Sequence, residues 1–385
     1  MIGNGIVTDA ELRAGFIARC QRGEGGLTFA VKDTLDVAGM PTRAGSRALR
    51  LAANASEDAA IVGQLLNAGC QLRGKTALHE LAFGVTGINP WCGTPVNPLF
   101  PRLIPGGSSS GSACVVAAGC VDFAIGTDTG GSVRMPAACC GIWGLKTTFG
   151  ALSRLGIQPA ASSLDCPGFF TRDAATLLQV VEKLPGLLRH TSTALPAIGW
   201  VAGCADGPAE ALLARQLQRL SSPVHPVTLD HFAAAHQAAL TLIAFENWQE
   251  WGALARSRPN DIAADVLARL LRGAEVTRSQ RAAAAVVRRA FTRALDRQLN
   301  RTPLLLLPTL PTLPPTLSEA REPLGAIDLT RLIRPFNLSG HPALTFPAGV
   351  IDGRPVAWQL VAKRQGDMAL CRHAVMLAER LEYRP

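Results

Sequence analysis

Two glycine- and serine-rich stretches decide how this chain is interpreted: residues 106–112 read GGSSSGS, and residues 126–136 read GTDTGGSVRMP. The second stretch follows the apolar run 121–125, which predicts a strand that ends in a loop. The glycines before Ser132 permit a tight turn whose successive backbone N–H groups point into one concavity. A concavity of this kind stabilises an oxyanion, so Ser132 is a candidate nucleophile.

A serine nucleophile requires a general base, and no histidine lies near either stretch in the sequence. Lysine can act as the base when burial lowers its pKa, whereas arginine stays protonated. Lys32 ends the apolar stretch Leu27–Val31, and strand alternation is expected to place Asp33 on the opposite face. Strand-end lysines are also common on surfaces, so the pattern favours Lys32 without excluding a structural role.

A second motif points to a different serine. Residues 107–111, GSSSG, satisfy the G-x-S-x-G pattern of α/β-hydrolases, which would make Ser109 the nucleophile of an esterase. That motif requires a strand that runs directly into the turn, but the preceding residues PRLIPGG contain two prolines. Ser109 therefore stays as an alternative.

Residues 69–76, GCQLRGKT, match the phosphate-binding pattern G-x-x-x-x-G-K-[ST]. That pattern binds phosphate when a strand leads into the loop and a helix follows it. Here a helix predicted over 58–68 ends at Gly69 and a strand follows, which is the reverse order. We reject a nucleotide hydrolase. The seven histidines form no H-x-x-x-H or H-x-H pair, so we expect no metal site, and no cofactor is implied.

Composition limits the remaining classes. The 385 residues are 48% hydrophobic, which predicts a packed core, and the net charge is +9. The positive charge is mostly arginine among the alanines of 252–301, and aromatic residues make up only 5%; this favours a solvated helical face over a nucleic-acid site. No run of about 20 apolar residues predicts a membrane span. The ten cysteines show no disulfide framework and no leader is evident, so we expect a cytoplasmic protein.

Strands and helices are predicted to alternate along the chain, which indicates an α/β core. We expect helices at 9–22, 58–68, 111–119, 173–184, 207–220, 230–256, 261–300 and 367–382. We expect strands at 27–31, from 70, and at 121–126, 304–307, 343–347 and 355–361.

The two opening stretches and their surroundings resemble the amidase signature family. The resemblance rests on GGSSSGSA and GTDTGGSVRMPAACCGIWGLKTTFGALSRLGI, and on FAVKDTLDVAGMPTRAGS (29–46), GKTALHELAFGVTGINP (74–90), ASSLDCPGFFTRDAATL (161–177) and PFNLSGHPALTFPAG (335–349). It runs from about Phe29 to the last helix and is weakest in the arginine-rich middle.

The resemblance implies a catalytic unit. The two serines of the family lie 24 residues apart, which selects Ser132 as the nucleophile and Ser108 as a relay after a cis peptide bond from Gly107. Lys32 falls on the lysine of the family's VKD motif and is the expected base. The backbone N–H groups of the loop before the nucleophile would hold the oxyanion, namely those of Thr129, Gly130 and Gly131.

The resemblance also implies contacts with the substrate. The backbone near Ala82 is expected to line the acyl side of the substrate pocket. Arg134 is expected either to bind a substrate carboxylate or to hold the loop through a buried ion pair with Asp128; we favour the second role slightly.

The expected fold is an α/β/α sandwich around a mixed sheet, as one domain over 1–385. It comprises a signature core (29–180), a variable helical region (205–300) and C-terminal strands and helix (301–385). The expected activity is hydrolysis of a small carboxamide through an acyl-enzyme. The expected protein is cofactor-free, with a homodimer as its candidate assembly and no nucleic-acid or membrane partner. The alternatives are a glutamine-hydrolysing subunit of a tRNA-dependent amidotransferase and, at lower weight, a degenerate binding protein.

Overall fold

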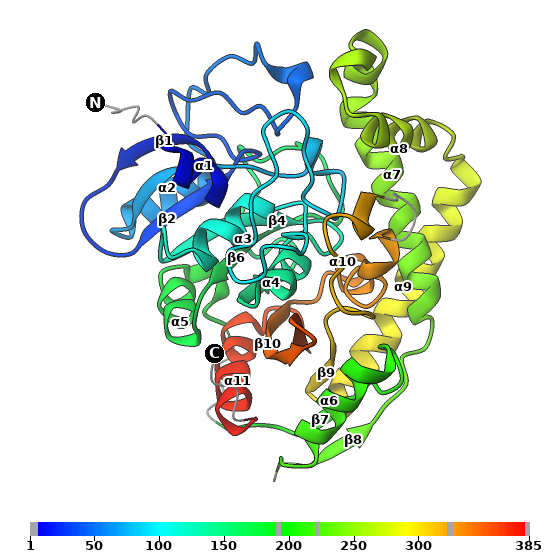
Figure 1. The fold of residues 1–385 in the computed structure, drawn as a ribbon. Coiled ribbons are helices and arrows are strands. Elements are labelled where there is room, and N and C mark those ends of the chain that lie inside the picture. The colour runs from blue at the N-terminus through cyan, green and yellow to red at the C-terminus, as the bar shows by residue number, and fades with distance from the viewer. Residues whose placement is uncertain (1–6, 190–193, 221–222, 322–325, 382–385) are drawn as a thin grey trace.

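The computed structural model describes residues 7–189, 194–220, 223–321 and 326–381. The helices are α1 (Asp9–Ala14), α2 (Ala60–Asn67), α3 (Ser110–Ala117), α4 (Arg134–Cys140), α5 (Ala174–Glu182), α6 (Gly207–Leu217), α7 (Phe232–Ser257), α8 (Ala264–Ala274), α9 (Arg278–Arg301), α10 (Pro335–Ser339) and α11 (Asp367–Arg380). The strands are β1 (Phe16–Arg22), β2 (Thr28–Lys32), β3 (Gln71–Thr76), β4 (Phe123–Asp128), β5 (Trp143–Lys146), β6 (Cys166–Thr171), β7 (Ile198–Trp200), β8 (Val224–Pro226), β9 (Leu304–Pro308), β10 (Ala343–Ile351) and β11 (Arg354–Ala362). Figure 1 shows their arrangement.

All strands of the described residues form one mixed sheet in the order β1-β3-β2-β4-β6-β5-β10-β11-β9-β7-β8. The strand β2 runs parallel to both of its neighbours, β3 and β4, whereas β4 and β6 are antiparallel. Because parallel neighbours end at the same edge of a sheet, the ends of β2 and β4 bring Lys32 and Thr127 together.

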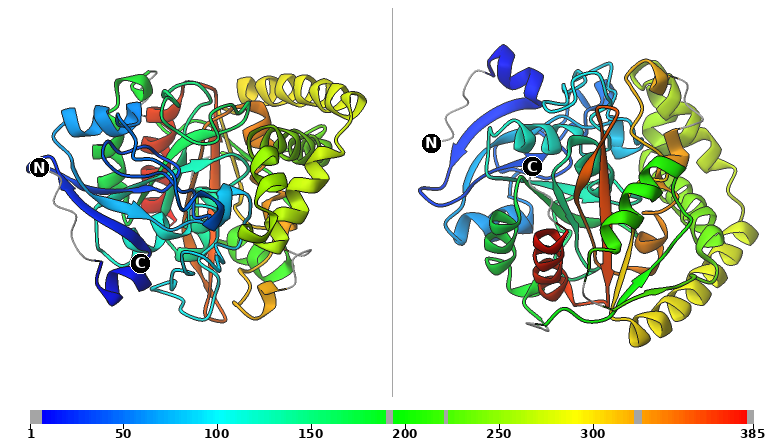
Figure 2. Two further views of the ribbon diagram at one scale, coloured as in Figure 1. Left: turned by 90° about the horizontal axis from the view of Figure 1, so that it is seen from above. Right: turned by 60° about the horizontal axis from the view of Figure 1, so that its bottom comes forward.

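Helices cover both faces of the sheet, and strand β9 shows why. Leu304 and Leu306 pack in one apolar cluster with α2, α5, α6 and α11, whereas Leu305 and Leu307 pack in another with α7, α9 and α10. Adjacent residues of a strand point to opposite faces, so a run of leucines supplies both layers. Figure 2 shows α11 on one side of the C-terminal strands and α7 to α9 on the other. The predicted α/β/α sandwich on a mixed sheet is confirmed.

The predicted helix over 9–22 is wrong in its second half. The helix α1 ends at Gly15, whose φ of 113° lies in the region that favours glycine. The chain then continues as β1, which pairs antiparallel with β3. The apolar residues of 16–22 fit either period, and their pairing with a strand far along the chain decides between the two.

The predicted helix over 261–300 is two helices. The chain leaves α8 at Ala274, and α9 starts after Thr277, whose side chain and that of Gln280 form a reciprocal capping box. Figure 1 shows α7, α8 and α9 together along one side of the molecule. The final helix ends at Arg380, and residue 382, the predicted end of that helix, lies outside the described residues.

Two further features concern the whole chain. All ten cysteines are free thiols, and most of them are buried. Within the described ranges, no helix combines the length and the apolar character that crossing a membrane requires.

Candidate active site

Lys32 lies at the end of β2, fully buried between two parallel strands. Its Nζ lies 2.7 Å from Ser108 Oγ and 2.9 Å from Thr127 Oγ1. Burial lowers the pKa of Lys32 to about 7, and the charges of Asp165 and Asp128 act in the opposite direction. An amine with this pKa is largely neutral at mildly alkaline pH and can accept a proton.

Asp33 points away from Lys32, as strand alternation predicts. Its carboxylate lies 2.7 Å from Lys75 Nζ, and both side chains are buried. Lys75 is the lysine of the phosphate-binding pattern, and it lies in β3 rather than at the start of a helix. The structure therefore agrees with rejecting a nucleotide site there.

The serine loop 106–109 leads into the N-terminus of α3. The peptide bond between Gly107 and Ser108 is cis. The carbonyl of Ser108 accepts a hydrogen bond from the backbone N–H of His79 at 2.9 Å. The next amide, that of Ser109, donates to the carbonyl of Ser132 at 3.2 Å, so the two serine loops are joined through their backbones.

Ser109 does not occupy the position that the esterase alternative requires. Its side chain is fully buried, and its Oγ lies 3.2 Å from the carbonyl oxygen of Thr127 and 3.3 Å from the Thr127 amide. No strand leads into this turn. Ser132, in contrast, lines a cavity of about 240 Å³.

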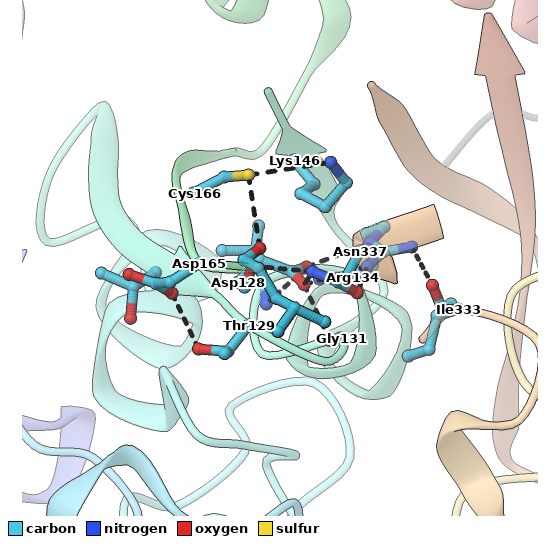
Figure 3. A network of polar contacts seen from close by, with 12 residues as sticks. Asp128, Thr129, Gly131, Arg134, Lys146, Asp165, Cys166, Ile333 and Asn337 are labelled. Carbon is cyan, nitrogen blue, oxygen red and sulfur yellow. Dashed lines mark hydrogen bonds and ion pairs between the residues drawn. The ribbon is translucent and has the colours of Figure 1, made fainter. Parts of the chain in front are cut away.

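The loop that carries Ser132 is built around the buried carboxylate of Asp128 (Figure 3). Asp128 accepts hydrogen bonds from the amides of Gly131, at 2.7 Å, and Val133, at 3.1 Å. Arg134 forms a two-armed ion pair with it, at 3.0 Å through Nε and 2.9 Å through Nη2. Against the effect of burial, the Arg134 charge holds the pKa of Asp128 well below its usual range.

Arg134 therefore shapes the loop and does not reach the cavity. Its side chain is fully buried, and its remaining donors bind the carbonyl of Ile333 and the side chains of Gln359 and Asn337. With its donors directed at protein acceptors, Arg134 has none to offer a substrate. The expectation that it binds substrate is wrong, and the ion pair with Asp128 is present.

One expected oxyanion donor also changes. The amide of Gly131 donates to Asp128, so it is not available to an oxyanion. In the described part of the chain, the amides of Gly130 and Ser132 have no protein acceptor, and Thr129, Gly130 and Ser132 line the cavity. The side chain of Thr129 is held by Asp165, with an Oγ1–Oδ1 distance of 2.8 Å (Figure 3).

The cavity beside Ser132 is mostly apolar. Ala82, Phe83 and Gly84 line one wall, which fits the expectation for Ala82, and Leu240 and Ile243 of α7 face them. Ala82 has a φ of 53°, so this wall takes a sharp turn at a non-glycine residue. Three arginines complete the lining: Arg269, Arg272 and Arg334.

Sequence reasoning missed a polar cluster at the cavity wall. Arg269 Nη2 lies 2.6 Å from Asp265 Oδ2 and 3.1 Å from His79 Nε2. Burial lowers the pKa of His79, so the ring stays neutral at neutral pH. The order H-E-L-A in 79–82 is part of the resemblance, but nothing in it indicates that α8, almost two hundred residues later, supplies the partners.

A larger cavity, of about 710 Å³, lies by Asp33, Lys75 and Trp91 and does not include Ser132. Within the described residues, no cluster of three or more histidine, cysteine, aspartate or glutamate side chains has the spacing of a metal site.

Comparison with known proteins places these features in a family. The amidase family model matches residues 25–202 and 209–371. Amidase 1 of Arabidopsis thaliana is 51% identical over 156 residues, which cover 40% of this chain and 37% of that protein. A glutamyl-tRNA(Gln) amidotransferase subunit of Methanospirillum hungatei JF-1 is 31% identical over 389 residues, which cover 88% of this chain and 89% of that protein. A crystal structure of an amidase superimposes with a TM-score of 0.83 at 31% identity, and covers 92% of this chain and 84% of that one.

The fold and these comparisons define an enzyme of the amide-hydrolysing class. More particularly, the chain belongs to the amidase family, and the resemblance drawn from the sequence is confirmed.

Proposed function

We propose that this protein is a serine amidase that hydrolyses the C–N bond of a small carboxamide, with Ser132 as nucleophile, Ser108 as relay and Lys32 as base. One observation carries the proposal: the buried amine of Lys32 lies 2.7 Å from Ser108 Oγ. A lysine whose pKa is lowered by burial, in contact with a serine next to a cavity-lining serine, is the arrangement that activates a hydroxyl nucleophile.

The proposed reaction starts with neutral Lys32. Ser132 Oγ gives its proton to Ser108 Oγ, which passes its own proton to Lys32 Nζ, while Ser132 Oγ bonds to the amide carbon. The C–N bond then breaks, and the proton returns through Ser108 to the leaving nitrogen. Water repeats the sequence on the acyl-enzyme and releases the carboxylic acid.

The oxyanion would be held by backbone amides of the same loop. Gly130 and Ser132 offer free N–H groups at the cavity, and Thr129 adjoins them. Fixed donors of this kind each contribute about 10²–10³ in rate. The ion pair of Asp128 and Arg134 keeps the loop in place.

Covalent labelling tests the nucleophile. A fluorophosphonate is expected to add once, and peptide mapping is expected to locate the adduct on Ser132. Released ammonia from a panel of small amides measures turnover in parallel. An adduct on Ser109, or activity that EDTA abolishes and zinc restores, would contradict the proposal.

A second candidate is a glutamine-hydrolysing amidotransferase subunit. It is favoured by relatives of that name that align along most of this chain. A homo-oligomer with unaided amidase activity supports the first candidate, and activity that requires partner chains supports the second. A homodimer and a cytoplasmic location remain predictions, which sedimentation and cell fractionation test.

A further inference from the structure

Arg334 occupies an unusual position in the amidase cavity. It precedes α10, is 6% exposed and lines the same cavity as Gly130 and Ser132. A methyl group placed on Gly130 would lie 2.7 Å from Arg334 Nε. The guanidinium therefore lies against the loop that carries the proposed nucleophile.

This guanidinium has unused donors. In the part of the chain that the structure describes, Arg334 Nε and Nη1 are buried without a hydrogen-bond acceptor. No carboxylate of the described residues forms an ion pair with it. Asp128 attracts its charge, but the oxygens of Asp128 already bind Arg134 and backbone amides.

Arg269, in the same cavity, provides the contrast. Its charge is matched by Asp265 at 2.6 Å, so it needs no further anion. Arg334 has no such partner among the described residues, and it stays protonated at neutral pH even though burial lowers its pKa to about 10. An unpaired buried cation is costly, and it persists where something else supplies the negative charge.

The shape of the cavity limits what that anion can be. Its volume of about 240 Å³ accommodates a small molecule, and the walls between the polar groups are apolar, with Phe83 and Ile243. The planar guanidinium fork matches a carboxylate. We propose that the substrate is the half-amide of a short dicarboxylic acid, with its carboxamide at Ser132 and its carboxylate on Arg334. This inference rests on the proposed amidase function and adds the substrate class.

Matched substrate pairs test the proposal by activity. Malonamate, succinamate and glutaramate carry a carboxylate, and propionamide, butyramide and valeramide are their neutral counterparts of equal chain length. We expect the best half-amide to exceed its neutral partner in kcat/KM by about 100-fold or more, the scale of a charge-assisted hydrogen-bonded pair. Arg334→Met should remove this advantage mainly through KM and leave the neutral amide within about threefold.

Arg331→Met is the control, since Arg331 lies three residues earlier and pairs with Asp328 outside the cavity. It should retain the preference. If wild type prefers neutral amides, or if Arg334→Met lowers turnover of both classes equally, Arg334 serves the oxyanion or the packing and the proposal is wrong.

A binding measurement separates this proposal from the function on which it rests. Calorimetric titration of Ser132→Ala protein with the three half-amides should show binding, and Ser132→Ala/Arg334→Met should show at least a tenfold loss. Succinate should also raise the melting temperature of wild type but not of Arg334→Met. Binding without turnover supports the carboxylate site and contradicts the amidase function; no binding of any half-amide contradicts the carboxylate site.

Discussion

At the scale of single residues, the site depends on where Lys32 can release its charge. Desolvation lowers its pKa, and Asp165 and Asp128 oppose that effect. The two acids are themselves held by Arg154 and Arg134. Their negative charge is thereby partly compensated, so burial dominates at the amine.

The first prediction concerns pH. Because the base must be deprotonated, kcat/KM should rise about tenfold per pH unit below an apparent pKa near 7 and level off above it. Lys32→Arg should be as inactive as Lys32→Met, since arginine retains the charge without the basicity. A profile between about pH 5.5 and 9.5 checks the first point. Substantial turnover by Lys32→Arg would assign the base to another group.

The second prediction uses two neighbouring serines as a matched pair. Ser108→Ala removes the hydroxyl beside Lys32, and kcat should fall about 10²–10⁴-fold with the fold retained. Ser109→Ala removes a hydroxyl that contacts only Thr127, so it should cost stability of about 1 kcal/mol and less than about tenfold in rate. Single-turnover kinetics and thermal melts measure both. Equal losses in rate would remove Ser108 from the relay.

At the scale of elements, the position of α8 sets one wall of the cavity. Gly273 packs against α7, and a methyl group there would lie 2.3 Å from the carbonyl oxygen of Ala244. Any larger residue must push α8 away from α7. The arginines of α8, Arg269 and Arg272, would move with it.

The third prediction follows from this close approach. Gly273→Ala should raise KM several-fold and destabilise the protein by about 1–3 kcal/mol, the usual cost of overpacking. Gly63→Ala in α2 is the control, because nothing lies within 4 Å of its added methyl group. It should be neutral or stabilising by up to about 1 kcal/mol. A Gly273→Ala enzyme with unchanged KM would mean that α8 does not shape the pocket.

Elements whose signal is local could be predicted from the sequence. The helix α2 with Gly69 at its end, the strand β2 and the glycine loop before Ser132 follow from periodicity and turn residues. Strand β1 could not be predicted, since its identity depends on pairing with β3. The break between α8 and α9 does carry a local signal, the capping pair Thr277 and Gln280, but helical residues on both sides of it favour one continuous helix.

The site divides in the same way. Lys32, Ser108 and Ser132 lie in stretches that carry their own pattern, and the structure brings Lys32 to Ser108. Arg334 is one arginine in an arginine-rich chain, and its lack of a partner is visible only after folding. The same holds for Gly131, whose amide is taken by Asp128 through the geometry of the loop.

At the scale of the whole molecule, the net charge of +9 is spread rather than gathered. Many arginines pair with acids at the surface, among them Arg22 with Asp58 and Arg354 with Glu319. Such pairs reduce the field that a nucleic acid would feel.

The fourth prediction is therefore weak, salt-sensitive binding of RNA. Fluorescence anisotropy with labelled tRNA should give a Kd no tighter than about 10⁻⁶ M at physiological salt, the range of non-specific contacts. The affinity should fall steeply as salt is added. Tight binding that resists salt would favour the amidotransferase candidate.

The alternation at the end of β2 has a consequence for how the chain can change in length. Lys32 and Asp33 are adjacent letters, yet one contacts Ser108 and the other contacts Lys75 in a separate cavity. Deleting one residue upstream in the strand would exchange the two faces, so a carboxylate would stand where the amine belongs. Residues 28–33 should thus accept many substitutions but no single insertion or deletion, and a deletion scan of this strand should find inactive proteins at every position.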